Sequence, residues 1–126
     1  MARGVRLGGS LAVIGIGRND LGQFPVDDSS SSSIPGTELL PKSLAVLPNG
    51  NVIREIWTGS EFSMALDCTG LLWSSGWNDH ANLGTGNCAP ARGWVAVKDG
   101  EGRHMTVQEP WEGSIACGGG HVVCIS

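Results

Sequence analysis

Two pairs of short motifs recur along this chain at the same separation. The segment 15–24, GIGRNDLGQF, aligns with the segment 76–86, GWNDHANLGTG, at an offset of 59 residues. The segment 56–66, IWTGSEFSMAL, aligns with the segment 115–125, IACGGGHVVCI, at the same offset. One spacing shared by two separate motifs indicates an internal repeat, which constrains a fold more strongly than any single motif.

The matched positions hold residue types that set turns and strand faces. Glycines and asparagines fall on glycines and asparagines, and apolar residues fall on apolar residues. The aligned pairs are Gly17 with Gly76, Asn19 with Asn78, Asp20 with Asp79, Gln23 with Asn82, Phe24 with Leu83, Ile56 with Ile115, and Gly59 with Gly118.

Each repeat consists of segments of strand length. Glycine accounts for 20 of the 126 residues and charged residues for 16%, a composition typical of short strands joined by tight turns. No segment carries a capped apolar stripe with the 3.6-residue period of a helix. Four antiparallel strands per repeat predict an all-β chain of about two four-stranded β-propeller blades. Apolar or alternating patterns favour strands at 11–16, 43–47, 52–58, 62–67, 71–76, 94–97, 114–117 and 121–125.

The sequence therefore predicts one partial propeller over residues 1–126. Its repeat motifs occupy 11–24, 52–86 and 114–126. The segment 25–36, PVDDSSSSSIPG, is acidic and rich in serine, so we expect a mobile loop there.

Charge and hydropathy argue against two kinds of partner. The net charge is −4 and the basic residues are scattered, so we expect no nucleic-acid interface. No stretch approaches the roughly 20 apolar residues of a membrane span, so we expect no membrane partner. The four cysteines form no C-x-x-C pair, which predicts free, mostly buried thiols in a cytoplasmic or nuclear protein.

Cofactor and metal motifs are incomplete. Gly15-x-Gly17 imitates the start of a dinucleotide fingerprint, but Asp20 stands where the third glycine is needed and Pro25 follows in place of a helix. No three ligands stand at metal spacing. The sequence predicts neither a cofactor nor a metal.

The best copy of the repeat, residues 53–86, resembles the repeats of the regulator of chromosome condensation family. That family's pattern is an Ile and a Gly before a His-Ser-x-Ala-Leu strand, then a turn glycine and a W-G-x-N-x-x-G-Q-L-G turn. This copy keeps Ile56, Gly59, Ser63, Ala65, Leu66, Gly70, Gly76, Asn78, Leu83, Gly84 and Gly86. The first copy keeps Gly17, Asn19, Gly22 and Gln23, and the last keeps Gly118 and His121.

This chain departs from the family pattern in three places. The His-Ser pair is split between Phe62-Ser63 in one copy and His121-Val122 in the other, and Ala81 stands where the turn has its second glycine. Pro25 replaces the glycine expected after Phe24. The GWNDH stretch also resembles a narrower branch that includes the alpha-tubulin suppressor and the secretion-regulating exchange factor.

The resemblance implies a fragment of a propeller of about seven blades that acts as a protein–protein interaction module. In some members of the family this activity is linked to nucleotide exchange on a small GTPase, and a chain that lacks blades is expected to self-associate. Two alternatives stay open. The chain can be a truncated propeller without independent function, or an enzyme of the propeller lyase type.

The residues of the turns divide into a structural set and an interface set. Trp77, Asp79 and His80 are the candidate interface, because the repeat does not require Trp77 and His80 and the stretch is chemically rich. Asp79 and His80 are adjacent, and adjacent residues rarely orient one another for general base work, so we predict no catalytic residue and no enzyme. The structural set is Gly17, Asn19, Gly22, Gly59, Ser63, Gly70, Gly76, Asn78, Leu83, Gly84, Gly118 and His121.

Overall fold

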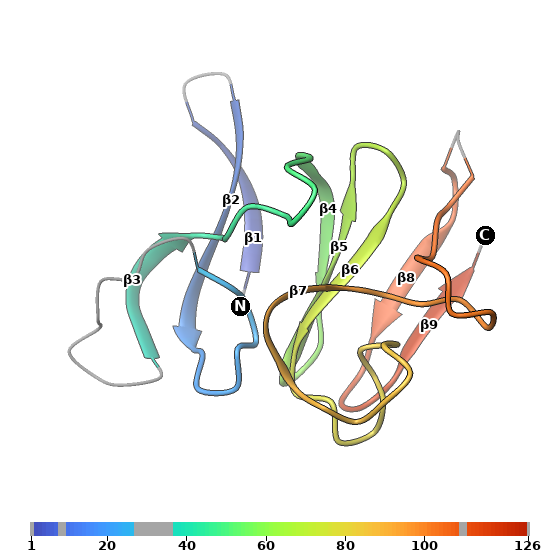
Figure 1. Ribbon diagram of the computed structural model, residues 1–126. Coiled ribbons are helices and arrows are strands. Elements are labelled where there is room, and N and C mark those ends of the chain that lie inside the picture. Colours follow the sequence, from blue (N-terminus) through green and yellow to red (C-terminus); the bar gives the residue numbers. More distant parts are fainter. Residues whose placement is uncertain (1, 8–9, 27–36, 109–110, 126) are drawn as a thin grey trace.

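The chain folds as three antiparallel sheets that lie side by side (Figure 1). The structure, a computed structural model, describes residues 2–7, 10–26, 37–108 and 111–125. Within these ranges it is all-β, and it holds no helix of a length and hydropathy that would cross a membrane. The strands are β1 (Ala2–Leu7), β2 (Ser10–Arg18), β3 (Thr37–Ser43), β4 (Ile53–Thr58), β5 (Phe62–Asp67), β6 (Leu72–Gly76), β7 (Ala91–Ala96), β8 (Ser114–Cys117) and β9 (Val122–Ile125).

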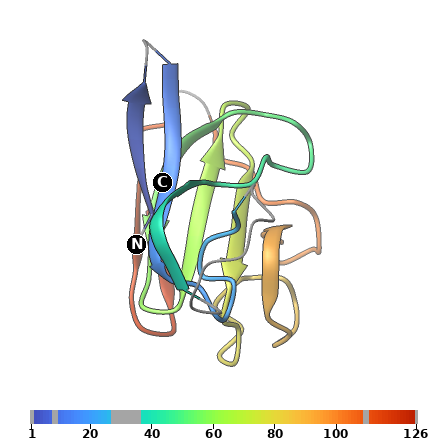
Figure 2. The ribbon, with the colours of Figure 1, turned by 90° about the vertical axis from the view of Figure 1, so that its left-hand side faces the viewer.

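The middle sheet has the order β4-β5-β6-β7 and is the complete four-stranded unit. Every residue of β5 and of β6 is buried, as expected for strands covered on both faces. On one side lies the sheet β1-β2-β3, and on the other lies the hairpin β8-β9. Figure 2, viewed from the side of β1–β3, shows the sheets stacked one behind another.

Alternating side chains of the middle sheet enter two separate cores. Ala65 and Trp73, which are paired in register, face the first sheet and pack with Phe24 and Leu47. Met64, Leu66 and Leu72 face the hairpin and pack with Leu83 and Ile115. Full burial of one such large apolar side chain contributes about 1.5–3 kcal/mol, so each face needs a neighbouring sheet.

The backbone repeats at the offset found in the sequence. The Gly59 N–H donates to the Phe62 carbonyl at 2.9 Å, and 59 residues later the Gly118 N–H donates to the His121 carbonyl at 2.9 Å. The hairpin β8-β9 therefore corresponds to β4-β5, and β2 corresponds to β6, because Gly17 and Gly76 both have positive φ near the ends of these strands.

Two predictions, one about a strand and one about the thiols, were wrong. Residues 44–47 are not a strand: β3 ends at Ser43, and Leu44 and Leu47 turn inward as core residues ahead of the Pro48 turn. The sequence analysis also missed β1, which pairs along β2. The cysteines are free, but Cys68, Cys88 and Cys124 are exposed because they lie in turns or on an uncovered strand. The predicted loop 25–36 lies, apart from residues 25 and 26, outside the described residues.

The repeat predicts a strong effect of a side chain at Gly76. This residue has a φ of 118°, and a Cβ atom there would lie 2.6 Å from the Glu61 carbonyl oxygen. We expect Gly76→Val to reduce the free energy of unfolding by at least about 2 kcal/mol, measured by urea unfolding. Gly93→Val in β7 is the matched control, since open space surrounds Gly93. Equal stability of the two variants would contradict the structural role assigned to Gly76.

Candidate functional site

The two asparagine turns have the same hydrogen bonds. The Asn78 Oδ1 accepts the Leu83 N–H at 2.9 Å, and the Asn19 Oδ1 accepts the Phe24 N–H at 3.1 Å. In both turns the asparagine carbonyl also accepts a backbone N–H three residues later. Each asparagine thereby holds the following buried apolar residue, Leu83 or Phe24, against its core.

The second turn is anchored more deeply than the first. The Asn78 side chain is fully buried, and its Nδ2 donates to the carbonyls of Asn87 and Ala89 at 3.0 and 2.8 Å. These bonds hold the long loop between β6 and β7 onto the end of the sheet. Ala81, the residue that departs from the family pattern, has a φ of 56°, and Gly22 has a φ of 74° at the equivalent position. The alanine therefore keeps the turn conformation despite its Cβ.

The predicted structural glycines lie where a side chain does not fit or where φ is positive. Gly59 lies under the Phe62 ring and Gly118 lies under the His121 ring, so the aromatic residue three positions later packs on the glycine in both copies. The His121 side chain is exposed, and among the described residues its ring nitrogens make no hydrogen bond. Positive φ is found at Gly17, Gly22, Gly70, Gly76 and Gly84.

Ser63 connects the middle sheet to the first turn. Its buried hydroxyl donates to the Gln23 carbonyl. Two other buried serines, Ser74 and Ser75, donate to the carbonyls of Leu83 and Gly22 at 2.8 and 2.7 Å. The sequence analysis did not identify Ser74 and Ser75, because serines inside an apolar strand carry no sign of their distant partners.

The candidate interface residues meet at the tip of the second turn. The rings of Trp77 and His80 contact edge to face, with centroids 4.8 Å apart and an interplanar angle of 82°. Gly120, in the β8–β9 turn, lies against this pair, since a Cβ there would be 2.6 Å from the His80 Cδ2. Asp79 and His80 are exposed, whereas Trp77 is half-buried. Within the described residues the Asp79 carboxylate makes no hydrogen bond or ion pair.

The first turn uses its polar residues differently. The Arg18 guanidinium beside Asp20, together with a hydrogen bond from Gln23, lowers the pKa of the Asp20 carboxyl to about 2. The Gln23 Nε2 also donates to Glu61 at 2.9 Å, and Arg18 contacts Glu61 at 3.2 Å. At the second turn Trp77 stands in the position of Arg18 and Gly120 in the position of Glu61, so this network is absent there and the Asp79 carboxylate remains available.

Asp67, at the end of β5, is a buried carboxylate that the sequence analysis missed. Its Oδ1 accepts the N–H groups of Thr69 and Leu71 at 2.8 and 3.0 Å, and its Oδ2 accepts from Asn49 Nδ2 at 3.0 Å and Trp73 Nε1 at 3.2 Å. The D-x-T-G stretch before β6 is an Asx-turn pattern that signals this role. The residue ties three segments together at the end of the sheet opposite the asparagine turns.

The three histidines lie in different surroundings. His104 stacks edge to face on Trp73 at 4.5 Å, and its Nε2 lies 2.7 Å from the Leu72 carbonyl. His80 and His121 line a cavity of about 340 Å³ between β6 and the hairpin. In the part of the chain that the structure describes, no three His, Cys, Asp or Glu side chains are placed to hold a metal ion.

Successive antiparallel sheets that repeat at 59 residues, with the same asparagine turn at one end, are blades of a β-propeller. No family profile matches the chain. Protein RCC2 homolog of Xenopus laevis is 33% identical over 73 residues, and mouse and human protein RCC2 are each 32% identical over 73 residues. Over these residues the chain is similar to proteins of the RCC1-type repeat family.

A solved structure supports this assignment. The crystal structure of Kap60 bound to yeast RCC1 (Prp20) matches with a TM-score of 0.54 and 27% identity, over 92% of this chain and 26% of that chain. The matches to the RCC2 proteins cover 58% of this chain and 13% of each relative. The chain thus corresponds to a small part of these larger proteins.

The buried Asp67 predicts an acid-sensitive fold. Burial raises the pKa of its carboxyl, but the hydrogen bonds it accepts lower it more, so that the pKa lies well below its ordinary value. A depressed pKa stabilises the folded chain fully above the ordinary pKa of about 3.9, and the stabilisation is lost as the pH falls below that value. We expect Asp67→Asn to reduce the free energy of unfolding at pH 7 by about 2–3 kcal/mol and to weaken its acid dependence.

Urea unfolding between neutral and acidic pH measures both effects. The matched control is Asp79→Asn, an exposed site where we expect a change within about 0.5 kcal/mol. A pH profile of Asp67→Asn that coincides with that of the wild type would refute the role of this carboxylate.

Proposed function

We propose that this chain is a protein–protein interaction module whose binding surface is the tip of the second asparagine turn, formed by Trp77, Asp79 and His80. The observation that carries the proposal is the contrast within this turn. Asn78 and Leu83 are fully buried and hold the backbone, while Asp79 and His80 project from it. A rigid turn that presents a carboxylate and an imidazole loses little conformational entropy on binding.

The contacts of the tip support a binding role. The Trp77 ring orients the His80 ring, and the β8–β9 turn at Gly120 supports both from the side. Trp is enriched among residues that dominate the energy of protein interfaces. The equivalent acid of the first turn, Asp20, is already paired with Arg18, so its carboxylate is less available to a partner.

The relatives favour a protein as the partner. The matched solved structure is a complex of yeast RCC1 (Prp20) with Kap60, which is itself a protein–protein complex. We propose by extension a protein partner for this chain, with a small GTPase as the first candidate and nucleotide exchange as the activity to examine. A cytoplasmic or nuclear location accords with such a partner.

A catalytic role is less well supported than binding. The ring of His104 packs on Trp73, and His104 does not line the cavity that His80 and His121 share. General base catalysis needs an imidazole or carboxylate within hydrogen-bond reach of the proton that it removes. Asp79 and His80 are both exposed on a turn, an arrangement better suited to contact with a macromolecule than to an enclosed reaction.

Removing the tip should abolish binding without unfolding the chain. We expect the double variant Asp79→Ala/His80→Ala to lower affinity for the partner at least about tenfold, since interface hot spots contribute more than about 1 kcal/mol each. Its free energy of unfolding should stay within about 0.5 kcal/mol of the wild type. Quantitative affinity capture with the wild type and the double variant, followed by biolayer interferometry of both against purified small GTPases, measures the change in affinity.

The matched control is the double variant Glu101→Ala/Gln108→Ala, which alters exposed side chains of the loop between β7 and β8. That loop is joined to the opposite end of β6, where the Val107 N–H donates to the Gly70 carbonyl. The control should bind as the wild type does. Equal binding by the tip variant and the wild type would refute the proposed surface. Release of a fluorescent GDP analogue from the GTPases tests exchange separately.

A further inference from the structure

The turn between β3 and β4 contains the one Asn-Gly pair of the sequence, Asn49-Gly50. An asparagine followed by a glycine is chemically labile, because the next backbone nitrogen can attack the side-chain amide carbon and glycine has no Cβ atom to hinder the approach. Asn49 and Gly50 are both exposed, and open space surrounds Gly50. The reacting groups are therefore accessible to water and to solvent base.

The folded turn engages both groups that would react. The Gly50 N–H donates to the Leu47 carbonyl at 2.8 Å, which closes the turn. The Asn49 Oδ1 accepts the Asn51 N–H at 3.0 Å, and the Asn49 Nδ2 donates to the Asp67 Oδ2 at 3.0 Å. Ring closure therefore requires the Gly50 N–H bond to break and the Asn49 side chain to rotate away from its partners.

Two core residues anchor the turn, and the residues between them are more exposed. Leu47 and Ile53 are 2% and 9% exposed and belong to the same core cluster. Pro48 and Val52, which lie between these anchors, are exposed. Because the anchors need not move, the turn can leave the sheet in a local opening, without unfolding of the whole chain.

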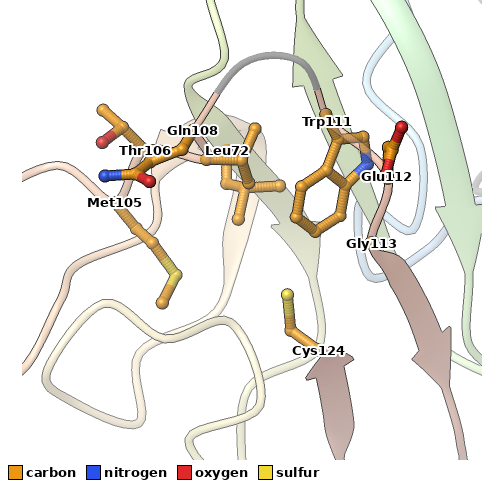
Figure 3. Close-up of a pocket in the computed structure, with 9 residues that line it drawn as sticks. Leu72, Met105, Thr106, Gln108, Trp111, Glu112, Gly113 and Cys124 are labelled. Carbon is orange, nitrogen blue, oxygen red and sulfur yellow. The ribbon is translucent and has the colours of Figure 1, made fainter. Parts of the chain in front are cut away.

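Asp67, the partner of this turn, is held in place by the sheet. It ends β5, and the strand that follows is tied to the loop beyond β7, since the Leu72 N–H donates to the Met105 carbonyl at 3.1 Å (Figure 3). The Asp67 Oδ2 also accepts the Trp73 Nε1–H at 3.2 Å. The carboxylate thus stays in position when Asn49 moves away from it.

Deamidation replaces a donor to Asp67 with a negative charge. The Asn49 Nδ2 lies 3.0 Å from the Asp67 Oδ2, and an aspartate at position 49 would place a second carboxylate there. Like charges this close oppose the ionisation of one another, so the converted turn cannot resume its native contacts at neutral pH without a large loss of stability. The isoaspartate product also adds a methylene to the main chain, which changes the geometry of the turn.

We propose that Asn49-Gly50 is a deamidation site controlled by the fold, and that its conversion prevents the turn from closing again on Asp67. When the turn opens, the Gly50 nitrogen bonds to the Asn49 Cγ and gives its proton to water or hydroxide. The Cγ–Nδ2 bond breaks, and the released nitrogen takes up a proton and leaves as ammonia. Water then opens the cyclic imide at either carbonyl and yields aspartate or isoaspartate.

The conversion weakens one end of the middle sheet. Asn49 and Asn51 both donate to the Asp67 Oδ2, at 3.0 and 3.3 Å, and both bonds are lost while the turn stays open. A converted chain is therefore less stable than a newly made one. Because hydrolysis of the imide does not restore the amide, converted chains accumulate in proportion to how often the turn has opened.

Peptide mapping by mass spectrometry measures whether the fold controls the reaction. At one pH and temperature, we expect Asn49 to deamidate at least about tenfold more slowly in the folded chain than in the chain unfolded in urea, because the reaction must wait for the turn to open. We expect Asp67→Asn to raise the rate in the folded chain about tenfold, since a hydrogen bond to a charged acceptor is stronger than one to a neutral amide.

Gly76→Val is the matched control, because it lowers stability at the opposite end of the sheet. It should leave the rate in the folded chain unchanged. Equal rates in the folded and unfolded wild type would overturn the control by the fold. Equal acceleration by Asp67→Asn and Gly76→Val would overturn the role of Asp67, since global unfolding would then expose the site.

Substitution tests the charge that the reaction introduces. At pH 7 we expect Asn49→Asp to have a lower urea midpoint than Asn49→Ala, which removes the donor without adding a charge. Repulsion by Asp67 favours proton uptake by the new carboxyl in the folded chain, so the deficit should shrink as the pH falls toward about 4. If Asn49→Asp is unfolded at pH 7, recovery of its circular dichroism at about pH 4 gives the same readout.

Asn87→Asp is the matched control for the added charge. The Asn87 Oδ1 accepts the Ala89 N–H at 2.9 Å and the Thr85 hydroxyl at 3.3 Å, and an aspartate keeps both roles. The urea midpoint of this control should match that of the wild type at pH 7. An Asn49→Asp chain as stable as Asn49→Ala at pH 7 would refute the proposed effect of conversion.

Discussion

The fold depends on a sheet that is apolar on both faces. The strands β5 and β6 are buried along their whole length, so the sheet β4–β7 is stable only between two neighbours. The turn after β2 supplies Phe24 and the segment after β3 supplies Leu47 on one side, and the hairpin supplies Ile115 on the other. Each neighbouring sheet must be covered in the same way, which is why such sheets build closed or stacked arrays in repeat proteins.

Polar groups fix the position of each sheet relative to the next. Asn19 and Asn78 close the turns at one end, and Asp67 gathers backbone and side-chain donors at the other end. Ser63 and Ser75 donate to carbonyls of the preceding turn and so link the turn of one blade to the strands of the next. Because these groups are buried, losing one partner leaves another unsatisfied, which makes the arrangement specific.

In each asparagine turn, the buried residues that hold the backbone are separate from the exposed residues at the tip, and this separation connects the fold to the proposed function. The asparagine and the apolar residue of each turn are buried and repeated, and the residues between them are exposed and differ between the copies. Asp20 forms an ion pair with Arg18, whereas Asp79 forms no ion pair within the described residues. The difference arises at position 77, where tryptophan replaces the arginine found at position 18, and at position 120, where glycine replaces the glutamate found at position 61. Local changes of this kind alter a binding surface without altering the blade.

The sequence by itself determined the repeat, the all-β class, the positions of β4, β5, β6, β8 and β9 and the two asparagine turns, because glycine conformations, turn chemistry and strand alternation are local properties. It misplaced a strand at 43–47, since an apolar segment that enters a core has the same composition as a strand. It missed Asp67 and the buried serines, whose partners are brought close only by strand pairing. The exposed thiols were also decided by tertiary structure, because burial depends on which sheet lies alongside.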